Sequence, residues 1–296
     1  MAVIKPFKSI RPRKGLEDKI AALPYDVYNR SEAKQAVKDN PLSFLNIDRP
    51  ETQYDDDFDM YSDESYQTAA RLLDGMLERN EYIRDDKAYY YIYELTMNGR
   101  AQTGIVAVAS VDDYINETIK KHENTRADKE LDRIRHVDTL SAQTGPIFLA
   151  YKSNEAINSI VDKVKTTEPL YDFVSDDLIS HRVWIISDSD DISCIQDAFS
   201  TINSIYIADG HHRCASAVKV SLKRRQEKPD YTGDEEFNYF LSVLFPDNQL
   251  MIMDYNRVIK DLNGKTEAEI IDELKKVGTL DELNSDDKHP REKGDV

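Results

Sequence analysis

The sequence is poor in cysteine and in long apolar runs, and each shortage excludes a class of protein. Its two cysteines, Cys194 and Cys214, form no CxxC pair and have no zinc-type ligands spaced around them. A reduced protein without a disulfide framework is therefore expected. The longest apolar runs, such as 104–109 and 146–151, fall far short of the roughly 20 residues that cross a bilayer. The basic N-terminus has no apolar core of a secretory signal, so we expect a cytoplasmic protein without a membrane partner.

Positive charge is also scarce. The chain has 39 Lys and Arg against 56 Asp and Glu, a formal net charge of −17. Such a surface repels phosphate backbones, which argues against a nucleic-acid partner. A small anion can still bind in a local basic pocket, because salt limits the reach of the global field to roughly 10 Å.

Apolar spacing and turn residues predict the secondary structure. Strands are expected at 2–12, on both sides of Asn98-Gly99, and at 147–152, 172–177, 179–187, 204–208, 237–246 and 249–259. Helices are expected at 31–40 with Ser31 as N-cap, 62–83, much of 116–142, 153–166, 191–202, 214–225 and 267–277. Hairpins and helices interleave without a strict βαβ rhythm, which predicts an α+β fold of mixed β-sheets with flanking helices.

The predicted domain division follows from composition. Residues 1–260 carry the strong elements and are expected to form one catalytic or nucleotide-binding unit. Residues 261–296 hold a helix and a polar tail, which is expected to be partly disordered.

The stretch SIYIADGHHRCASAVKV, residues 204–220, joins a predicted strand to a predicted helix. A helix N-terminus carries unpaired N–H groups and a partial positive charge. Gly210 allows close backbone approach, and His211, His212 and Arg213 add donors. Asp209 is placed to cap the helix, orient a histidine or hold magnesium. The cluster predicts an anion cradle, most naturally for phosphate.

Two other interpretations compete with the anion cradle: an ordinary turn and a zinc site. Asp-Gly is a common turn dipeptide, and paired histidines occur in ordinary turns. A zinc site is the third reading, but adjacent histidines at a helix start do not point to the same side and make poor paired ligands.

A second cluster lies in KKHENTRADKELDRIRH, residues 120–136. Phosphoryl transfer needs cations on the transferred group and a base for the attacking oxygen. Lys121, His122 and Arg126 could supply the first, and Glu123 the second. For residues 130–135 a solvated helix with i,i+4 charge pairs is the preferred interpretation.

Six segments together resemble a known family. They are, in order, SIRP, LPYDVYN, NPLSFLNIDRPE, KKHENTRADKELDRI, TGPIFLAY and YIADGHHR. This combination resembles a bacterial domain-of-unknown-function family marked by KHExT- and DGHHR-type signatures. That family looks distantly similar to the ParB/sulfiredoxin-like superfamily, which includes free-serine kinases. The resemblance covers roughly residues 1–260. Family members usually carry a longer C-terminal part, so a segment that closes the site is expected to be missing or replaced here.

The resemblance implies a ParB/sulfiredoxin-like nucleotide-binding core and assigns roles to both clusters. It places Asp209, Gly210, His211, His212 and Arg213 at the phosphate. It makes Lys121, His122, Glu123 and Thr125 the partner cluster. Family context in serine biosynthesis suggests serine or phosphoserine as substrate, with ATP or ADP.

The leading hypothesis is a serine kinase-like phosphotransferase. Catalysis is assigned to Glu123 as base, with His122, Asp209 and His212, and Asp209 would place Mg²⁺. Phosphate binding is assigned to Lys121, Thr125, Arg126, Gly210, His211 and Arg213. A non-catalytic nucleotide-responsive binding module and a phosphoserine phosphatase are the alternatives.

Overall fold

The computed structural model describes residues 1–125, 127–251 and 260–280. It contains two separately compact units, Met1–Leu250 and Met251–Val296. The strands are β1 (Ile4–Lys5), β2 (Ile10–Pro12), β3 (Tyr82–Arg84), β4 (Tyr90–Met97), β5 (Arg100–Ser110), β6 (Ile119–Lys120), β7 (Ile147–Tyr151), β8 (Tyr171–Val174), β9 (Ser180–Ile186), β10 (Ile205–Asp209) and β11 (Tyr239–Pro246). The α-helices are α1 (Glu17–Ile20), α2 (Arg30–Val37), α3 (Leu45–Asp48), α4 (Asp63–Glu78), α5 (Val111–Ile115), α6 (Ala127–Leu140), α7 (Glu155–Lys165), α8 (Ser189–Ser200), α9 (His211–Glu227) and α10 (Glu267–Leu274).

The first unit is built on one mixed sheet, which confirms the predicted α+β class. Its strand order is β6-β10-β7-β11-β5-β4-β9-β8, and β1 pairs with the far end of β5. β11 lies in the middle, parallel to β7 and antiparallel to β5. Five consecutive residues of β11, 242–246, are buried, as expected of a strand covered on both faces.

The predicted hairpin at Asn98-Gly99 is confirmed. Both residues have positive φ, 51° and 77°, and β4 pairs with β5 down to Met97 opposite Arg100. A two-residue turn of this kind matches the right-handed twist of its strands, which is why Asn-Gly specifies it. The second predicted hairpin is also present as β8 and β9.

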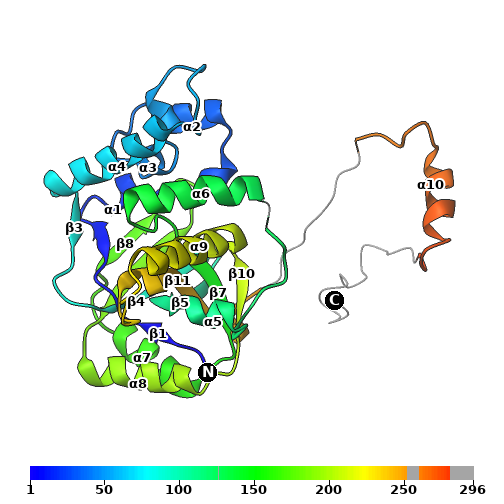
Figure 1. Cartoon of the computed structure of the whole chain (residues 1–296). Coiled ribbons are helices and arrows are strands. Elements are labelled where there is room, and N and C mark those ends of the chain that lie inside the picture. The colour runs from blue at the N-terminus through cyan, green and yellow to red at the C-terminus, as the bar shows by residue number, and fades with distance from the viewer. Residues whose placement is uncertain (126, 252–259, 281–296) are drawn as a thin grey trace. The chain divides into compact units, whose positions relative to one another are not determined.

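Helices enclose the sheet and also form a smaller core of their own. α7, α8 and α9 contribute Ile157, Phe199 and Val218 to the main core. A second cluster centred on Ile47, Leu73 and Met76 joins α3 and α4. α6 contacts both α4 and α9, and it runs alongside α9 (Figure 1). α6 therefore links the helical layer to the sheet layer.

The structure corrects several local expectations. The predicted helix 62–83 ends at Glu78, and Tyr82–Arg84 forms β3. The predicted strand 2–12 is two short strands in different sheets: β1 joins the main sheet, and β2 pairs with β3 in a separate sheet. The N-cap of α2 is Asn29, not Ser31, because Asn29 and Glu32 form a reciprocal capping box.

The C-terminal unit is described only in part. The predicted helix 267–277 is present as α10, which begins at a Thr266–Glu269 capping box. The predicted strand 249–259 and the polar tail after residue 280 lie largely outside the described residues. Among the described residues, no helix is long and apolar enough to span a bilayer.

Candidate functional site

The strand–turn–helix junction forms as the sequence predicts. Ile205 and Ile207 of β10 are buried while Tyr206 is exposed, the period-2 pattern of a half-buried strand. Gly210 follows with φ +89°, a left-handed conformation that L side chains rarely adopt, and it is the N-cap of α9. The glycine is therefore required by the backbone that starts the helix.

Strand pairing brings the second cluster to this junction. β6 is parallel to β10, with Ile119 opposite Ile205 and Lys120 opposite Tyr206. Parallel neighbours end at the same edge of a sheet. The residues after Lys120 consequently emerge beside the residues that start α9.

His211 is the contact point between the two clusters. Its ring lies 4.4 Å from the ring of His122 in an edge-to-face arrangement. The backbone N–H of His122 donates to His211 Nε2 at 3.5 Å, so the proton of the neutral ring sits on Nδ1. That Nδ1 lies 3.7 Å from the Glu123 carboxylate. A carboxylate, an imidazole and a helix N-terminus thus share one corner.

The electrostatics of His211 keep its ring neutral. Burial lowers the pKa of His211, and the neighbouring His122 lowers it further, while Glu123 opposes the shift. His211 has 6% of its side chain exposed, whereas Glu123 has 60%. The carboxylate is therefore the solvent-facing member of the pair.

An ion pair between the buried Glu130 carboxylate of α6 and the exposed Lys219 of α9 supports the site. Thr125 and Lys219 both donate to the Glu130 carboxylate, and Ser216 Oγ donates to the Glu130 carbonyl at 3.3 Å and the His212 carbonyl at 2.7 Å. Burial opposes ionisation of Glu130, but the bonds from Lys219 and Thr125 outweigh it and lower its pKa.

The expectation of a solvated helix at 130–135 is wrong, because Glu130 and Arg133 are only 4% and 7% exposed. The polar side chains of α6 have partners on α9 and in the helical layer. The sequence of α6 alone does not reveal these partners. Thr125, predicted to bind phosphate, instead ties the connection to Glu130 in this structure.

Asp209 and Arg213 pair with each other. Arg213 Nη2 donates to Asp209 Oδ2 at 2.8 Å, and its Nη1 donates to the Pro146 carbonyl at 2.6 Å. A Cβ at Gly210 or at Gly145 would lie 3.2 Å from the guanidinium, so both glycines make room for it. Asp209 does not cap α9, since Gly210 is the N-cap and no side chain accepts there.

The remaining predicted residues are placed as follows. Lys121 Nζ lies 4.9 Å above the ring of Tyr114, a cation–π contact. His212 opens α9 beside His211. Arg126 lies outside the described residues. Within the described part of the chain, no group of three or more His, Cys, Asp or Glu could hold a metal ion.

A cavity of about 150 Å³ lies next to Arg213, between the helical layer and the sheet. Its polar lining comes from Tyr25, Asp48, Arg133, His136 and Arg213. Its apolar and remaining lining comes from Ala22, Leu23, Pro24, Phe44, Val137, Gln143, Thr144, Gly145, Pro146, Ile147 and Ala217. Sequence reasoning assigned no function to Tyr25, Asp48 or His136, and it placed Arg133 on a solvated face.

A signal for this cavity was nonetheless present. Five of the six segments that carry the family resemblance contribute to its lining, through Tyr25, Asp48, Arg133, Gly145 and Arg213. Those segments are far apart in the chain and have little else in common. Only the folded structure shows that these segments converge on one cavity.

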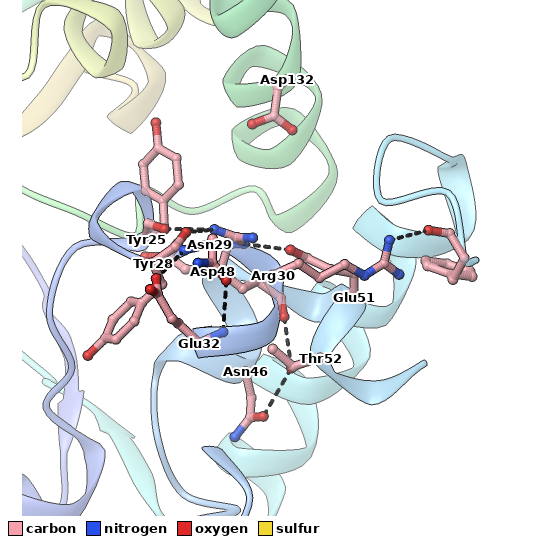
Figure 2. Close-up of polar contacts among 12 residues, drawn as sticks. Tyr25, Tyr28, Asn29, Arg30, Glu32, Asn46, Asp48, Glu51, Thr52 and Asp132 are labelled. Carbon is pink, nitrogen blue, oxygen red and sulfur yellow. Dashed lines mark hydrogen bonds and ion pairs between the residues drawn. The ribbon is translucent and has the colours of Figure 1, made fainter. Parts of the chain in front are cut away.

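A buried ion pair fixes the loop that carries Tyr25. Arg49 Nη1 donates to the carbonyls of Tyr25 at 2.9 Å and Tyr28 at 2.7 Å, and Arg49 Nε donates to Glu51 at 2.5 Å. Figure 2 shows this network around Tyr25, Asp48 and Glu51. One wall of the cavity is thereby held by hydrogen bonds that a flexible loop would lack.

Fold and site together define a mixed-sheet α+β protein with a polar corner at its β6–β10 edge and a charged cavity beside it. The sequence matches the family described as protein of unknown function (DUF1015) over residues 4–296. The chain therefore belongs to the DUF1015 family. No curated protein and no solved structure matches it.

Proposed function

We propose that the corner formed by Glu123, His122 and His211 transfers a phosphoryl group between a nucleotide and the hydroxyl of free serine. The observation that carries the proposal is the convergence of two clusters distant in sequence, with His211 Nδ1 3.7 Å from the Glu123 carboxylate. A carboxylate beside a helix N-terminus is the pairing this chemistry needs, since one group removes a proton and the other stabilises anionic oxygen. The proposal also includes a relationship of this fold to ParB/sulfiredoxin-like folds.

The step assigns each residue one role. The serine hydroxyl oxygen attacks the terminal phosphorus, its proton passes to Glu123, and the bond from phosphorus to the bridging oxygen of the nucleotide breaks. Nδ1–H of His211 faces the Glu123 carboxylate at 3.7 Å, and the N–H groups that begin α9 face the phosphoryl oxygens. Lys121 adds positive charge at the same edge.

Magnesium fits this corner as a partner of the nucleotide. Mg²⁺ usually takes one or two carboxylates together with phosphate oxygens and water. Asp209 accepts from Arg213 at Oδ2, which leaves Oδ1 to hold the ion. The ion would supply charge neutralisation on the phosphate oxygens.

The test is phosphoserine formation. Full-length protein is incubated with L-serine and Mg-ATP, or with phosphoserine and Mg-ADP, and the products are followed by ³¹P NMR. Glu123→Gln is expected to slow the reaction by about 10²- to 10⁴-fold, the usual size of a general-base contribution. Glu155→Gln, an exposed glutamate on α7, is the matched control and should keep the native rate.

Two results would contradict the proposal. One is the absence of product in both directions from folded protein. The other is a Glu123→Gln variant as fast as the native protein. Nucleotide binding without turnover would favour a nucleotide-responsive module, and release of inorganic phosphate from phosphoserine without nucleotide would favour a phosphatase.

A further inference from the structure

The cavity beside Arg213 has a charge pattern that the proposed phosphoryl-transfer corner does not use. Where Asp48 lines the wall, its buried Oδ1 accepts no hydrogen bond from the described residues, and Arg133 Nη1 lies 3.9 Å from that oxygen. The Asp48 side chain is 12% exposed. A dehydrated carboxylate without a donor is costly, so this part of the wall favours a ligand that donates hydrogen bonds.

His136 adds a second acceptor without a donor. Its Nε2 lies 3.0 Å from the Ile47 carbonyl, and because a carbonyl only accepts, the proton is on Nε2. Nδ1 then carries a lone pair, and it has no partner among the described residues. The side chain is 1% exposed. Burial, and then the charge of Arg133, lower the pKa of His136, which keeps this ring an acceptor at neutral pH.

Two guanidinium groups also line the cavity. Arg133 lies 4.1 Å from the centre of the Tyr25 ring and pairs with Asp132 at 2.8 Å. Arg213, in the first turn of α9, donates to Asp209 and to the Pro146 carbonyl. Forked guanidinium donors suit a planar carboxylate. The cavity thus offers acceptors from Asp48 and His136 and cationic donors from Arg133 and Arg213.

We propose that this cavity binds a small α-amino acid as its zwitterion, with the ammonium group on Asp48 and His136 and the carboxylate on Arg133 and Arg213. An anion alone would meet the Asp48 carboxylate, and an amine alone would meet two guanidinium groups. An apolar ligand would leave Asp48 without a donor. A zwitterion satisfies the acceptors and the donors at once.

Volume limits the ligand to a small side chain. A protein cavity of about 150 Å³ accepts a molecule the size of benzene, and free serine is of similar size. Ala22, Ala217 and Ile147 are among the apolar residues that line the wall, and a cavity of this volume suits a short side chain. The choice of serine within this class rests on the proposed function, whereas the assignment of an amino-acid site rests on the cavity alone.

Isothermal titration of full-length protein without nucleotide tests the assignment. L-serine and L-alanine are expected to bind, and ethanolamine and 3-hydroxypropionate, which lack the carboxylate and the ammonium respectively, should bind at least tenfold more weakly. Folded native protein that binds neither amino acid, or that binds the two truncated compounds equally well, overturns the proposal.

Three variants locate the binding. Asp48→Asn keeps the shape and should weaken serine binding by about 10- to 100-fold, the loss of one hydrogen bond to a charged group. Ala217→Leu fills the cavity from α9 and should abolish binding. Asp138→Asn makes the same chemical change on α6 at a carboxylate that pairs with Lys223 and Arg224, and should leave binding unchanged. Thermal unfolding shows that each variant is folded, and serine binding by folded Ala217→Leu at native affinity overturns the proposal.

The outcome separates this site from the proposed reaction. If serine binds by these criteria and no phosphoserine forms, the amino-acid site stands and the phosphotransferase does not. If phosphoserine forms while the KM for serine is unchanged in Asp48→Asn and Ala217→Leu, the phosphotransferase stands and the site does not.

Discussion

The β6–β10 corner and the cavity beside Arg213 differ in how their residues are distributed along the sequence. The corner takes its residues from two short runs, 121–123 and 209–213, and Glu123 is largely exposed. The cavity takes its residues from several distant segments, between one and five from each, and Arg133 and His136 are almost fully buried. The clustered functional groups make the corner recognisable in the sequence, whereas the cavity forms only when the helices pack against the sheet. Substitutions of polar side chains should therefore cost more stability at the cavity than at the corner.

The largest expected effect is at Arg133. Replacing it with leucine leaves Asp132 and Asp48 in a buried setting without their cation, and removing one partner of a buried pair costs about 3–5 kcal/mol. Urea denaturation measures the free energy of unfolding. Arg135→Leu, whose partner Asp63 is exposed, is the matched control and should lose less than about 1 kcal/mol. Equal losses in the two variants would remove the distinction between the regions.

A smaller effect is expected at Gly210. Alanine there must adopt φ +89° and crowd the Arg213 guanidinium, and the left-handed backbone alone costs about 1–2 kcal/mol. Gly15→Ala is the matched control, because Gly15 has φ +91° with nothing within 4 Å of the added Cβ. The excess loss in Gly210→Ala measures the Arg213 contact. If Gly15→Ala loses as much, that packing contributes nothing.

The pH dependence should reveal the buried His136. Its folded pKa lies below the ordinary value of 6.5 because of burial and Arg133, with Asp48 and Asp132 opposing the shift. The unfolded chain therefore binds a proton that the folded chain does not, and the free energy of unfolding falls as pH drops below 6.5 toward the folded pKa.

His136→Gln should flatten this slope between pH 7.5 and 5.5. His181 and His211 also have lowered pKa values and would leave a residual slope. Urea midpoints at several pH values check the difference, and an unchanged slope in His136→Gln would show that this ring does not couple folding to pH.

The smallest effect is expected for Glu123→Gln on stability. The carboxylate is mostly exposed and 3.7 Å from His211 Nδ1, so the free energy of unfolding should change by less than about 0.5 kcal/mol. The same variant is the one expected to lose phosphoryl transfer. A loss above about 2 kcal/mol would make Glu123 a structural residue and remove the contrast with Arg133.

The sequence allowed the elements and the corner to be predicted, because both depend on local signals. Asn98-Gly99 specifies its hairpin through positive φ, and Gly210 marks the strand-to-helix turn for the same reason. From the sequence, the proximity of the cluster at Lys121–Glu123 to His211 was only a hypothesis. In the structure, the parallel pairing of β6 with β10 brings the two together.

The cavity and the burial of α6 could not be predicted, because charged residues are buried only when distant partners exist. Glu130 is paired with Lys219 on α9, and Arg133 packs against the ring of Tyr25 in a distant loop. A helix with alternating charges has the same local sequence whether it faces water or such partners. The error at Ser31 has a smaller cause: Asn29 is the better cap because Glu32 stands three residues after it.

The central position of β11 has a consequence for synthesis of the chain. Until residues 239–246 leave the ribosome, β7 and β10 on one side and β5 and β4 on the other have no strand to join them. Two open strand edges are then exposed to solvent, and such edges recruit other chains. A nascent or truncated polypeptide that stops short of Tyr239 would be a fragment prone to aggregate, so expression of shorter pieces should keep this strand.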